Sequence, residues 1–341
     1  MSQVCMTPIT SPKAWRGETL ARETSWIVTL TDAEIADVDR ALATAKASGL
    51  PLESIQREHF PLPALGPRLE QEVAEMYDGR GFVVLRGLPV RRYRDEDVGL
   101  IFWGFGRYMG APLYQNPQGE LLGHVFDHGR TYGNIDVRGY ETNAYLPYHT
   151  DAGDVVGLLC LRRGLEGGVS SIVSSTTVHN EIAARHPEYL GLLYNGYYYI
   201  RREAALTERG VSERPIPVFG NQDGVVSCRY IRNQINAGAV KREVPLTTFE
   251  RAALDFLDEQ TRRPDLRLDM DLQAGDIQFI NNYTILHSRT GFVDGPAPDQ
   301  KRHMLRLWLK FPQPWPLSPE FPTHLGYKPS QDTPELIEAE T

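Results

Sequence analysis

The strongest constraint on the fold is the pattern of the chain after about residue 112, where short apolar runs alternate with glycine, proline, asparagine and aspartate. Short runs separated by turn-forming residues are typical of an antiparallel sandwich or barrel. Together with one earlier run bounded by glycines, the predicted strands cover residues 81–87, 157–161, 171–173, 197–201, 225–231, 276–280 and 303–311. We therefore expect a mainly β fold with added helices.

Helices are predicted on both sides of this change in pattern. Thr31 and Glu34 form a capping-box pattern, and the amphipathic run that follows them ends at Gly49. Further helices are predicted over residues 68–77, 95–108, 178–185 and 247–261. We expect residues 1–64 to form a helical segment packed on a core of residues 65–341, as one domain overall. The last stretch of the tail that begins at Pro312 is expected to be loosely held.

Composition limits the partners and the compartment. The 341 residues carry a net charge of −8 without a long basic block, which argues against a nucleic-acid partner. The three cysteines, Cys5, Cys160 and Cys228, are odd in number and lack metal-site spacing, as expected in a reducing compartment. No apolar run is long enough for a membrane span, and the first residues do not resemble a signal peptide. The sequence thus predicts a cytoplasmic protein that binds neither nucleic acid nor a membrane.

One pair of side chains and one distant histidine have the character of metal ligands. His149 and Asp151 are two residues apart, so on an extended chain they project to the same side. His287 follows a strand-like stretch late in the chain and could reach the same ion if the sheet folds back. Two histidines and one carboxylate leave open positions on Fe(II), although the same set also describes hydrolytic zinc sites or purely structural histidines.

A second group of charged residues lies on the last predicted strand. Alternation along residues 302–309 places Arg302 and Arg306 on one face, together with Met304 and Trp308. The planar guanidinium group suits bidentate recognition of a carboxylate. The two arginines could therefore bind organic anions beside a metal, or could pair with acids at the surface.

As an ensemble, these residues resemble the pattern of the taurine dioxygenase (TauD/TfdA-like) family, within the clavaminate synthase-like superfamily of Fe(II)/2-oxoglutarate oxygenases. The resemblance rests on the order and spacing of His149, Asp151, His287 and the two arginines, over roughly residues 65–311. The runs GFVVLRG (81–87) and GGVSSIV (167–173) are also similar to an early strand and a Gly-Gly turn of the family.

This resemblance implies a double-stranded β-helix (jelly-roll) core with Fe(II) held by His149, Asp151 and His287. It also implies 2-oxoglutarate and O₂ as co-substrates, with Arg302 on the distal carboxylate. Ser170 or Ser171 would assist at this carboxylate, and here the sequence departs from the family, which usually has a threonine. Candidates for substrate binding are Arg306, Asn143, Tyr145, Tyr148 and Arg232.

The expected reaction converts 2-oxoglutarate to succinate and CO₂ while a C–H bond of a small, anionic or amino-acid-like molecule is hydroxylated. Desaturation or ring closure is also compatible with the site. Because Asp151 is present, chlorination is not expected. The alternatives from other classes are a zinc-dependent hydrolase or lyase on a β-barrel and a β-barrel binding protein without catalysis.

Overall fold

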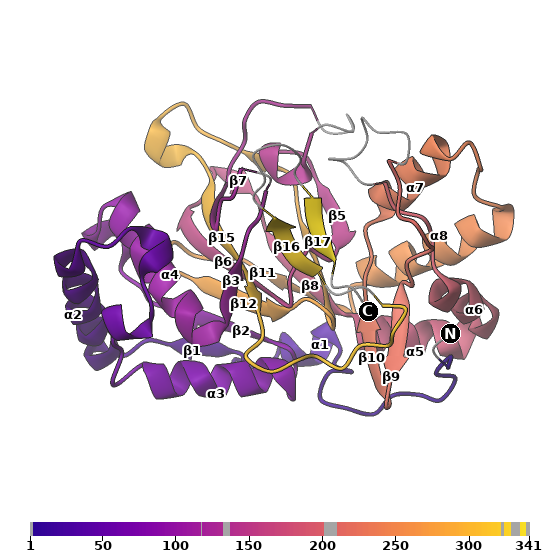
Figure 1. Cartoon of the computed structure of the whole chain (residues 1–341), viewed down its shortest axis with the longest axis horizontal. Helices are drawn as coiled ribbons and strands as arrows, with labels where there is room; N and C mark the ends of the chain where they lie inside the picture. The colour runs from indigo at the N-terminus through magenta and orange to yellow at the C-terminus, as the bar shows by residue number, and fades with distance from the viewer. Residues whose placement is uncertain are drawn as a thin grey trace.

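Two β-sheets pack face to face at the centre of the computed structural model (Figure 1), which describes residues 3–116, 118–131, 137–200, 210–321, 324–328 and 335–338. The larger sheet has the order β1 (Ile27–Thr29), β2 (Phe82–Arg86), β12 (Ile277–Asn281), β6 (Val155–Arg162), β15 (His303–Lys310) and β3 (Ala111–Leu113), with β4 (Leu122–Val125) also paired to β15. The smaller sheet has the order β11 (Arg267–Met270), β8 (Ser170–Ser174), β13 (Ile285–Arg289) and β5 (Leu146–His149). All pairs in the two sheets are antiparallel except β1 with β2.

Alternation along β15 assigns its two faces. Met304 and Trp308 belong to the apolar layer between the sheets, whereas Leu305 and Leu307 belong to the core on the outer side of the larger sheet. Each strand in this position therefore supplies side chains to two different layers. The inner layer is where polar residues from both sheets can meet.

Helices cover the outer face of each sheet. On the larger sheet lie α2 (Asp32–Ser48), α3 (Gly66–Tyr77) and α4 (Asp95–Met109), and on the smaller sheet lie α5 (Ser175–Arg185), α6 (Pro187–Asn195) and α8 (Thr248–Arg262). The short helix α1 (Gly17–Leu20) contacts β11, and α7 (Arg232–Lys241) follows the hairpin β9 (Phe219–Gln222) and β10 (Val225–Cys228). This is the expected β-rich α+β jelly-roll fold, flanked by helices.

The N-terminal segment shares its core with the rest of the chain. The capping box of α2 forms as predicted, since Thr31 and Glu34 exchange hydrogen bonds, and Gly49 ends the helix with φ of 65°. Val38 and Ala41 are fully buried in the same cluster as Phe102 on α4. Residues from the N-terminal segment and from the rest of the chain therefore belong to one apolar cluster.

The predicted strands over residues 81–87, 157–161, 171–173, 276–280 and 303–311 correspond to β2, β6, β8, β12 and β15. The strand predicted over residues 197–201 is wrong for its described part, since Tyr197 and Ile200 make only isolated bridges and Ile200 donates to Gln234 of α7. Arg201 lies outside the described residues. The strand predicted over residues 225–231 ends at Cys228, because the following residues turn into α7.

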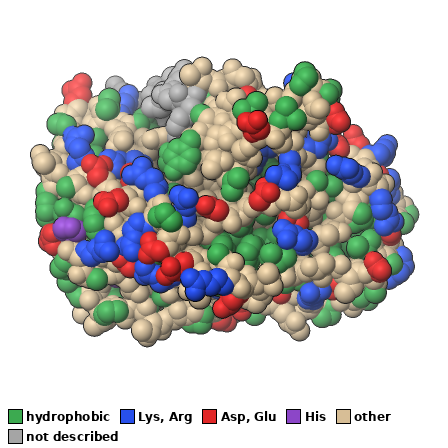
Figure 2. All heavy atoms as spheres, turned by 180° about the vertical axis from the view of Figure 1, so that it is seen from behind, with side chains coloured by type: hydrophobic (Ala, Val, Ile, Leu, Met, Phe, Trp, Pro, Cys, Tyr) green, Lys and Arg blue, Asp and Glu red, His purple; other side chains and the backbone are tan. Residues whose placement is uncertain are grey.

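Short antiparallel pairs complete the described chain: β7 (Glu166–Gly167) with β14 (Phe292–Val293), and β16 (His324–Lys328) with β17 (Glu335–Glu338). The end of the tail that was predicted to be loosely held falls largely outside the described residues. Among the described helices, none combines the length and apolar character needed to cross a membrane. On the face shown in Figure 2, lysine and arginine side chains are interspersed with acidic ones.

Candidate active site

The two histidines predicted as ligands lie side by side on neighbouring strands. His149 at the end of β5 is the register partner of His287 on β13, and their ring centroids are 4.3 Å apart. Directly opposed residues of an antiparallel pair point to the same face of the sheet, so both imidazoles enter the layer between the sheets. His149 Nδ1 lies 2.8 Å from the Pro147 carbonyl oxygen, which leaves Nε2 to face the interior.

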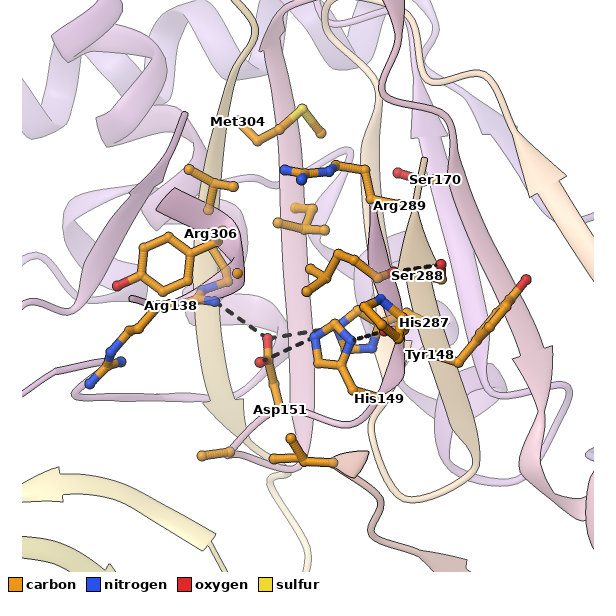
Figure 3. Close-up of a pocket in the computed structure, with 18 of the residues that line it drawn as sticks. Arg138, Tyr148, His149, Asp151, Ser170, His287, Ser288, Arg289, Met304 and Arg306 are labelled. Carbon is orange, nitrogen blue, oxygen red and sulfur yellow. Dashed lines mark hydrogen bonds and ion pairs between the residues drawn. The ribbon is translucent and has the colours of Figure 1, made fainter. Parts of the chain in front are cut away.

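Asp151 completes the group (Figure 3). Its Oδ1 lies 3.9 Å from His149 Nε2, and its Oδ2 lies 3.7 Å from His287 Nε2. One ligand atom from each of the three residues lies within 4.8 Å of the ligand atoms of the other two. Two nitrogen donors and one oxygen donor at this spacing suit a divalent transition metal with open positions. The donor set on the described residues therefore fits iron.

The backbone of Asp151 is clamped by the side chain of Asn282, which follows β12. Asn282 Oδ1 accepts from the Asp151 amide at 2.9 Å, and its Nδ2 donates to the carbonyl oxygens of Asp151 at 2.6 Å and Gly153 at 2.8 Å. Asn282 is 3% exposed, so water does not compete for these bonds. The turn that leads into the strand of His287 thus also fixes the third side chain.

The protonation states of His149 and Asp151 are those that metal binding requires. Burial, aided by the nearby His287, lowers the pKa of His149 to about 4. Burial alone would raise the pKa of Asp151, but Arg306 and the two histidines hold it well below its ordinary value. Neutral imidazole and ionised carboxylate coexist at neutral pH.

A cavity of about 210 Å³ opens between the sheets at the three side chains, a size that suits a small molecule. Arg302 lines it, is 5% exposed and stacks over Phe292 at 5.2 Å, while its Nη1 has no hydrogen-bond partner among the described residues. Gly168, with φ of 68°, lets the side chain approach, since a Cβ there would lie 2.8 Å from Arg302 Nε. A buried guanidinium with an unused donor is suited to an anionic ligand.

Arg306 lines the same cavity closer to the histidines (Figure 3). Its Nη1 is 3.5 Å from Asp151 Oδ2, and its Nε donates to Gln115 Oε1 at 2.7 Å. The guanidinium stacks on Tyr140 at 4.6 Å and on Trp308 at 4.5 Å. The predicted alternation of the strand therefore agrees with the structure, in which both arginines face the cavity.

Ser170 and Ser171, between which the sequence could not decide, have different surroundings in the structure. Ser170 lines the cavity, whereas Ser171 Oγ donates to Asp269 Oδ1 and also contacts Tyr148 Oη, each at 2.5 Å. Only Ser170 is therefore placed to contact a ligand near Arg302. Tyr148 contributes to the cavity lining, but its hydroxyl is engaged with Ser171.

The other predicted substrate residues differ in position. Arg232 lines the cavity, but its Nη1 and Nη2 pair with Asp258 at 2.8 Å and Asp255 at 2.6 Å, which joins α7 to α8. Asn143 and Tyr145 are not among the residues that line the cavity. The Asn143 carbonyl instead accepts from Phe292, and Tyr145 is 44% exposed.

Several lining residues were not predicted as site residues, among them Arg138, Tyr140, Gln278, Ser288 and Arg289. Arg289 follows His287 by two residues, so the strand period that identified Arg306 could have found it. Tyr140 lies in the short 3-10 helix η4 (Gly139–Glu141) and Arg138 precedes it, and no sequence signal indicates either residue.

The family model described as "Taurine catabolism dioxygenase TauD, TfdA family" matches residues 46–308. The chain belongs to this family. It is therefore an Fe(II)- and 2-oxoglutarate-dependent dioxygenase, as the sequence resemblance implied, and it uses iron, 2-oxoglutarate and O₂. The family match therefore argues against the two alternatives, a zinc-dependent hydrolase or lyase and a binding protein without catalysis.

Curated relatives cover most of the chain. It is 29% identical over 333 residues to FR-33289 synthase of Streptomyces rubellomurinus, with 96% of each chain covered. It is 31% identical over 308 residues to the taurine hydroxylase-like protein SAT17 of Stachybotrys chartarum, with 86% of this chain and 77% of that protein covered.

Solved structures share the fold at lower identity. An asparagine oxygenase in complex with Fe(II), hydroxyasparagine and succinate gives a TM-score of 0.64 at 18% identity, over 83% of this chain and 93% of that one. The non-haem iron oxygenase OrfP with Fe and α-ketoglutaric acid gives 0.62 at 18% identity, over 83% and 94%. At these identities the likeness is evidence of the jelly-roll fold.

Proposed function

We propose that this dioxygenase hydroxylates a C–H bond of a small molecule with an anionic group, with His149, Asp151 and His287 as the iron ligands. The observation that carries the proposal is the convergence of these three side chains with two buried arginines in one cavity between the sheets. Bound iron, with 2-oxoglutarate and O₂, supplies an oxidant able to remove hydrogen from an unactivated carbon.

Arg302 binds the distal carboxylate of 2-oxoglutarate, and Ser170 assists it. The support is chemical, because Arg302 is a buried cation with an unused donor and Ser170 is the serine that reaches the same cavity. An ion pair formed there is shielded from water, so it can orient the co-substrate strongly.

Arg306 binds the anionic group of the substrate. Its Nε is held by Gln115 and its faces are covered by two aromatic rings, so the Nη edge is the part of the fork left to reach into the cavity. Because Nη1 lies 3.5 Å from the carboxylate of Asp151, an anion bound there is close to the iron ligands. The substrate carbon that reacts is therefore expected a few bonds from the anionic atom.

Amino acids are the first substrate class to test, because asparagine oxygenase and OrfP were solved with hydroxylated asparagine and arginine. The chain's own residues would hold the amino acid by its carboxylate at Arg306, and the packed inner layer would keep water from the reacting carbon. A cytoplasmic location remains a prediction.

The decisive experiment measures succinate release with Fe(II), 2-oxoglutarate and O₂ across amino acids, sulfonates, betaines and natural-product precursors. We expect substrate-dependent succinate with at least one anionic class. Without O₂, Fe(II) and 2-oxoglutarate should give a weak visible charge-transfer band that Asp151→Ala abolishes and the exposed control Asp271→Ala retains. Absence of both the band and the succinate would refute the proposal.

The metal assignment has its own matched control. His149→Ala should lose stoichiometric iron, whereas His128→Ala, at an exposed histidine stacked on Phe126, should retain it. Equal iron content in the two variants would contradict the role of His149.

A further inference from the structure

Two neighbouring side chains, Trp308 and Arg306, contact the same oxygen of the Asp151 carboxylate. The Trp308 indole Nε1–H donates to Asp151 Oδ2 at 3.1 Å, and Arg306 Nη1 lies 3.5 Å from the same oxygen. A carboxylate can bind a metal through one oxygen or both, and hydrogen bonds from neighbouring groups decide which oxygen is available. Here the donors gather at Oδ2.

The indole is itself held in place. Trp308 is 4% exposed, lies between Leu113 on β3 and Val156 on β6 in the larger sheet, and stacks against the guanidinium of Arg306. Arg306 is fixed in turn by Gln115, whose Nε2 donates to the carbonyl oxygens of Leu121 at 2.8 Å and Arg306 at 2.7 Å. Gln115 is 2% exposed and uses its donors and its acceptor, so the whole series is anchored.

Tryptophan has the right chemistry for orienting a metal-binding carboxylate. Its indole nitrogen is a donor only and carries no charge, so it neither binds the metal nor changes the charge of the site. A histidine or lysine at the same place would compete as a ligand or as a cation. The large ring also reaches from the last part of β15 to Asp151, which an aliphatic residue on the strand would not do.

We propose that Trp308 is a positioning residue whose hydrogen bond occupies Oδ2 of Asp151, so that Oδ1 is the oxygen left to bind the metal. The bonds from Gln115 to Arg306 and the stacking of Arg306 on Trp308 hold the indole in the orientation that this requires. The inference rests on the proposed role of Asp151 as an iron ligand. It adds a residue of the cavity lining that acts through Asp151, by setting how this carboxylate meets the metal.

The test replaces the donor and keeps the ring. Trp308→Phe retains the aromatic face against Arg306 but lacks the N–H group. The matched control is Trp315→Phe, since Trp315 is also buried and donates its indole N–H, but to Ser227 Oγ at 2.8 Å, outside the residues that line the cavity. Both variants lose one buried hydrogen bond, so their unfolding in urea without metal should be comparable.

The measured quantity is the affinity for Co(II) alone, followed by its visible absorption, which reports the number and geometry of its ligands. We expect Trp308→Phe to bind Co(II) about 10-fold more weakly than the wild type and with an altered spectrum. Trp315→Phe should match the wild type in both. A Trp308→Phe protein with wild-type affinity and spectrum would overturn the inference.

The failure of the proposed function gives a different result. The ligand assignment itself is refuted if the wild type binds no Co(II), or if Asp151→Ala binds Co(II) with the same affinity as the wild type. The proposed role of Trp308 is then refuted as well. If the wild type binds Co(II) and Asp151→Ala does not, the comparison of the two tryptophan variants decides the inference alone.

Discussion

Replacing Arg302 by methionine separates co-substrate binding from folding stability. The guanidinium is buried with an unused donor, so keeping its charge in the protein costs free energy that no ion pair among the described residues offsets. Methionine fills a similar length without charge and loses only the stacking on Phe292. We therefore expect the free energy of unfolding, without ligands, to stay within about 1 kcal/mol of the wild type.

Binding of 2-oxoglutarate should change far more. A charge-assisted pair to a carboxylate in a buried site is worth about 3 kcal/mol, which corresponds to a roughly 100-fold weaker Kd. At a co-substrate concentration 100 times the wild-type Kd, the wild type gains about 2.7 kcal/mol of stability. The variant would be half saturated at that concentration and would gain only about 0.4 kcal/mol.

The assay is urea unfolding with and without 2-oxoglutarate, in the presence of Fe(II) and the absence of O₂. Arg232→Met is the matched control, for which we expect a change in stability without a change in co-substrate binding. It breaks ion pairs with Asp255 and Asp258, so it should destabilise the protein by about 1–2 kcal/mol and leave the affinity for 2-oxoglutarate unchanged. An Arg302→Met protein that binds 2-oxoglutarate normally, or that loses stability as the control does, would refute the reasoning.

Three further predictions concern positioning, pH and the serines. Asn282→Ala should weaken Co(II) binding about 10-fold, because the backbone of Asp151 loses its clamp; unchanged affinity would show that the clamp is dispensable. Burial lowers the pKa of His179 to about 4, so the fold favours its neutral form, and stability should fall by about 1.4 kcal/mol per pH unit as the pH drops from 6.5 towards 4. Urea unfolding of His179→Gln should show a flatter pH profile, and equal slopes would contradict this. Ser170→Ala should raise the Kd for 2-oxoglutarate several-fold while Ser171→Ala leaves it unchanged, and the reverse result in a titration would exchange the two assignments.

Local periodicity explains what the sequence could predict. The two-residue spacing of His149 and Asp151 and the alternation of Arg302 and Arg306 depend only on an extended backbone, and the side chains lie together as expected. For His287 the residues alone gave only the condition that the sheet folds back, and the family resemblance supported it, since its contact with His149 depends on sheet pairing. The same resemblance implied the jelly-roll core.

Contacts between distant segments explain what could not be predicted. Gln115 and Arg306 are 191 positions apart, and Asn282 and Asp151 are 131 apart, so no local pattern reveals either bond. Helix α7 was missed because its sequence, RNQINAGAVK, has no apolar stripe and contains a glycine. The aromatic run near Tyr197 has the composition of a strand, but its backbone hydrogen bonds are divided between Ile216, the segment at residues 211–212 and helix α7.

Strand β15 and the residue before it carry both anion-binding candidates, which has a consequence for engineering specificity. Arg302 and Arg306 are four strand positions apart, or about 13 Å along the backbone, a separation that pairing with β6 and β4 makes rigid. With the proposed roles of the two arginines, the strand would fix the distance between the distal carboxylate of the co-substrate and the anionic group of the substrate. Variant libraries that aim at longer or bulkier substrates should vary the segments at residues 138–140 and 229–234, which line the cavity from outside both sheets. Arg302, Arg306 and the strand that carries them should be kept.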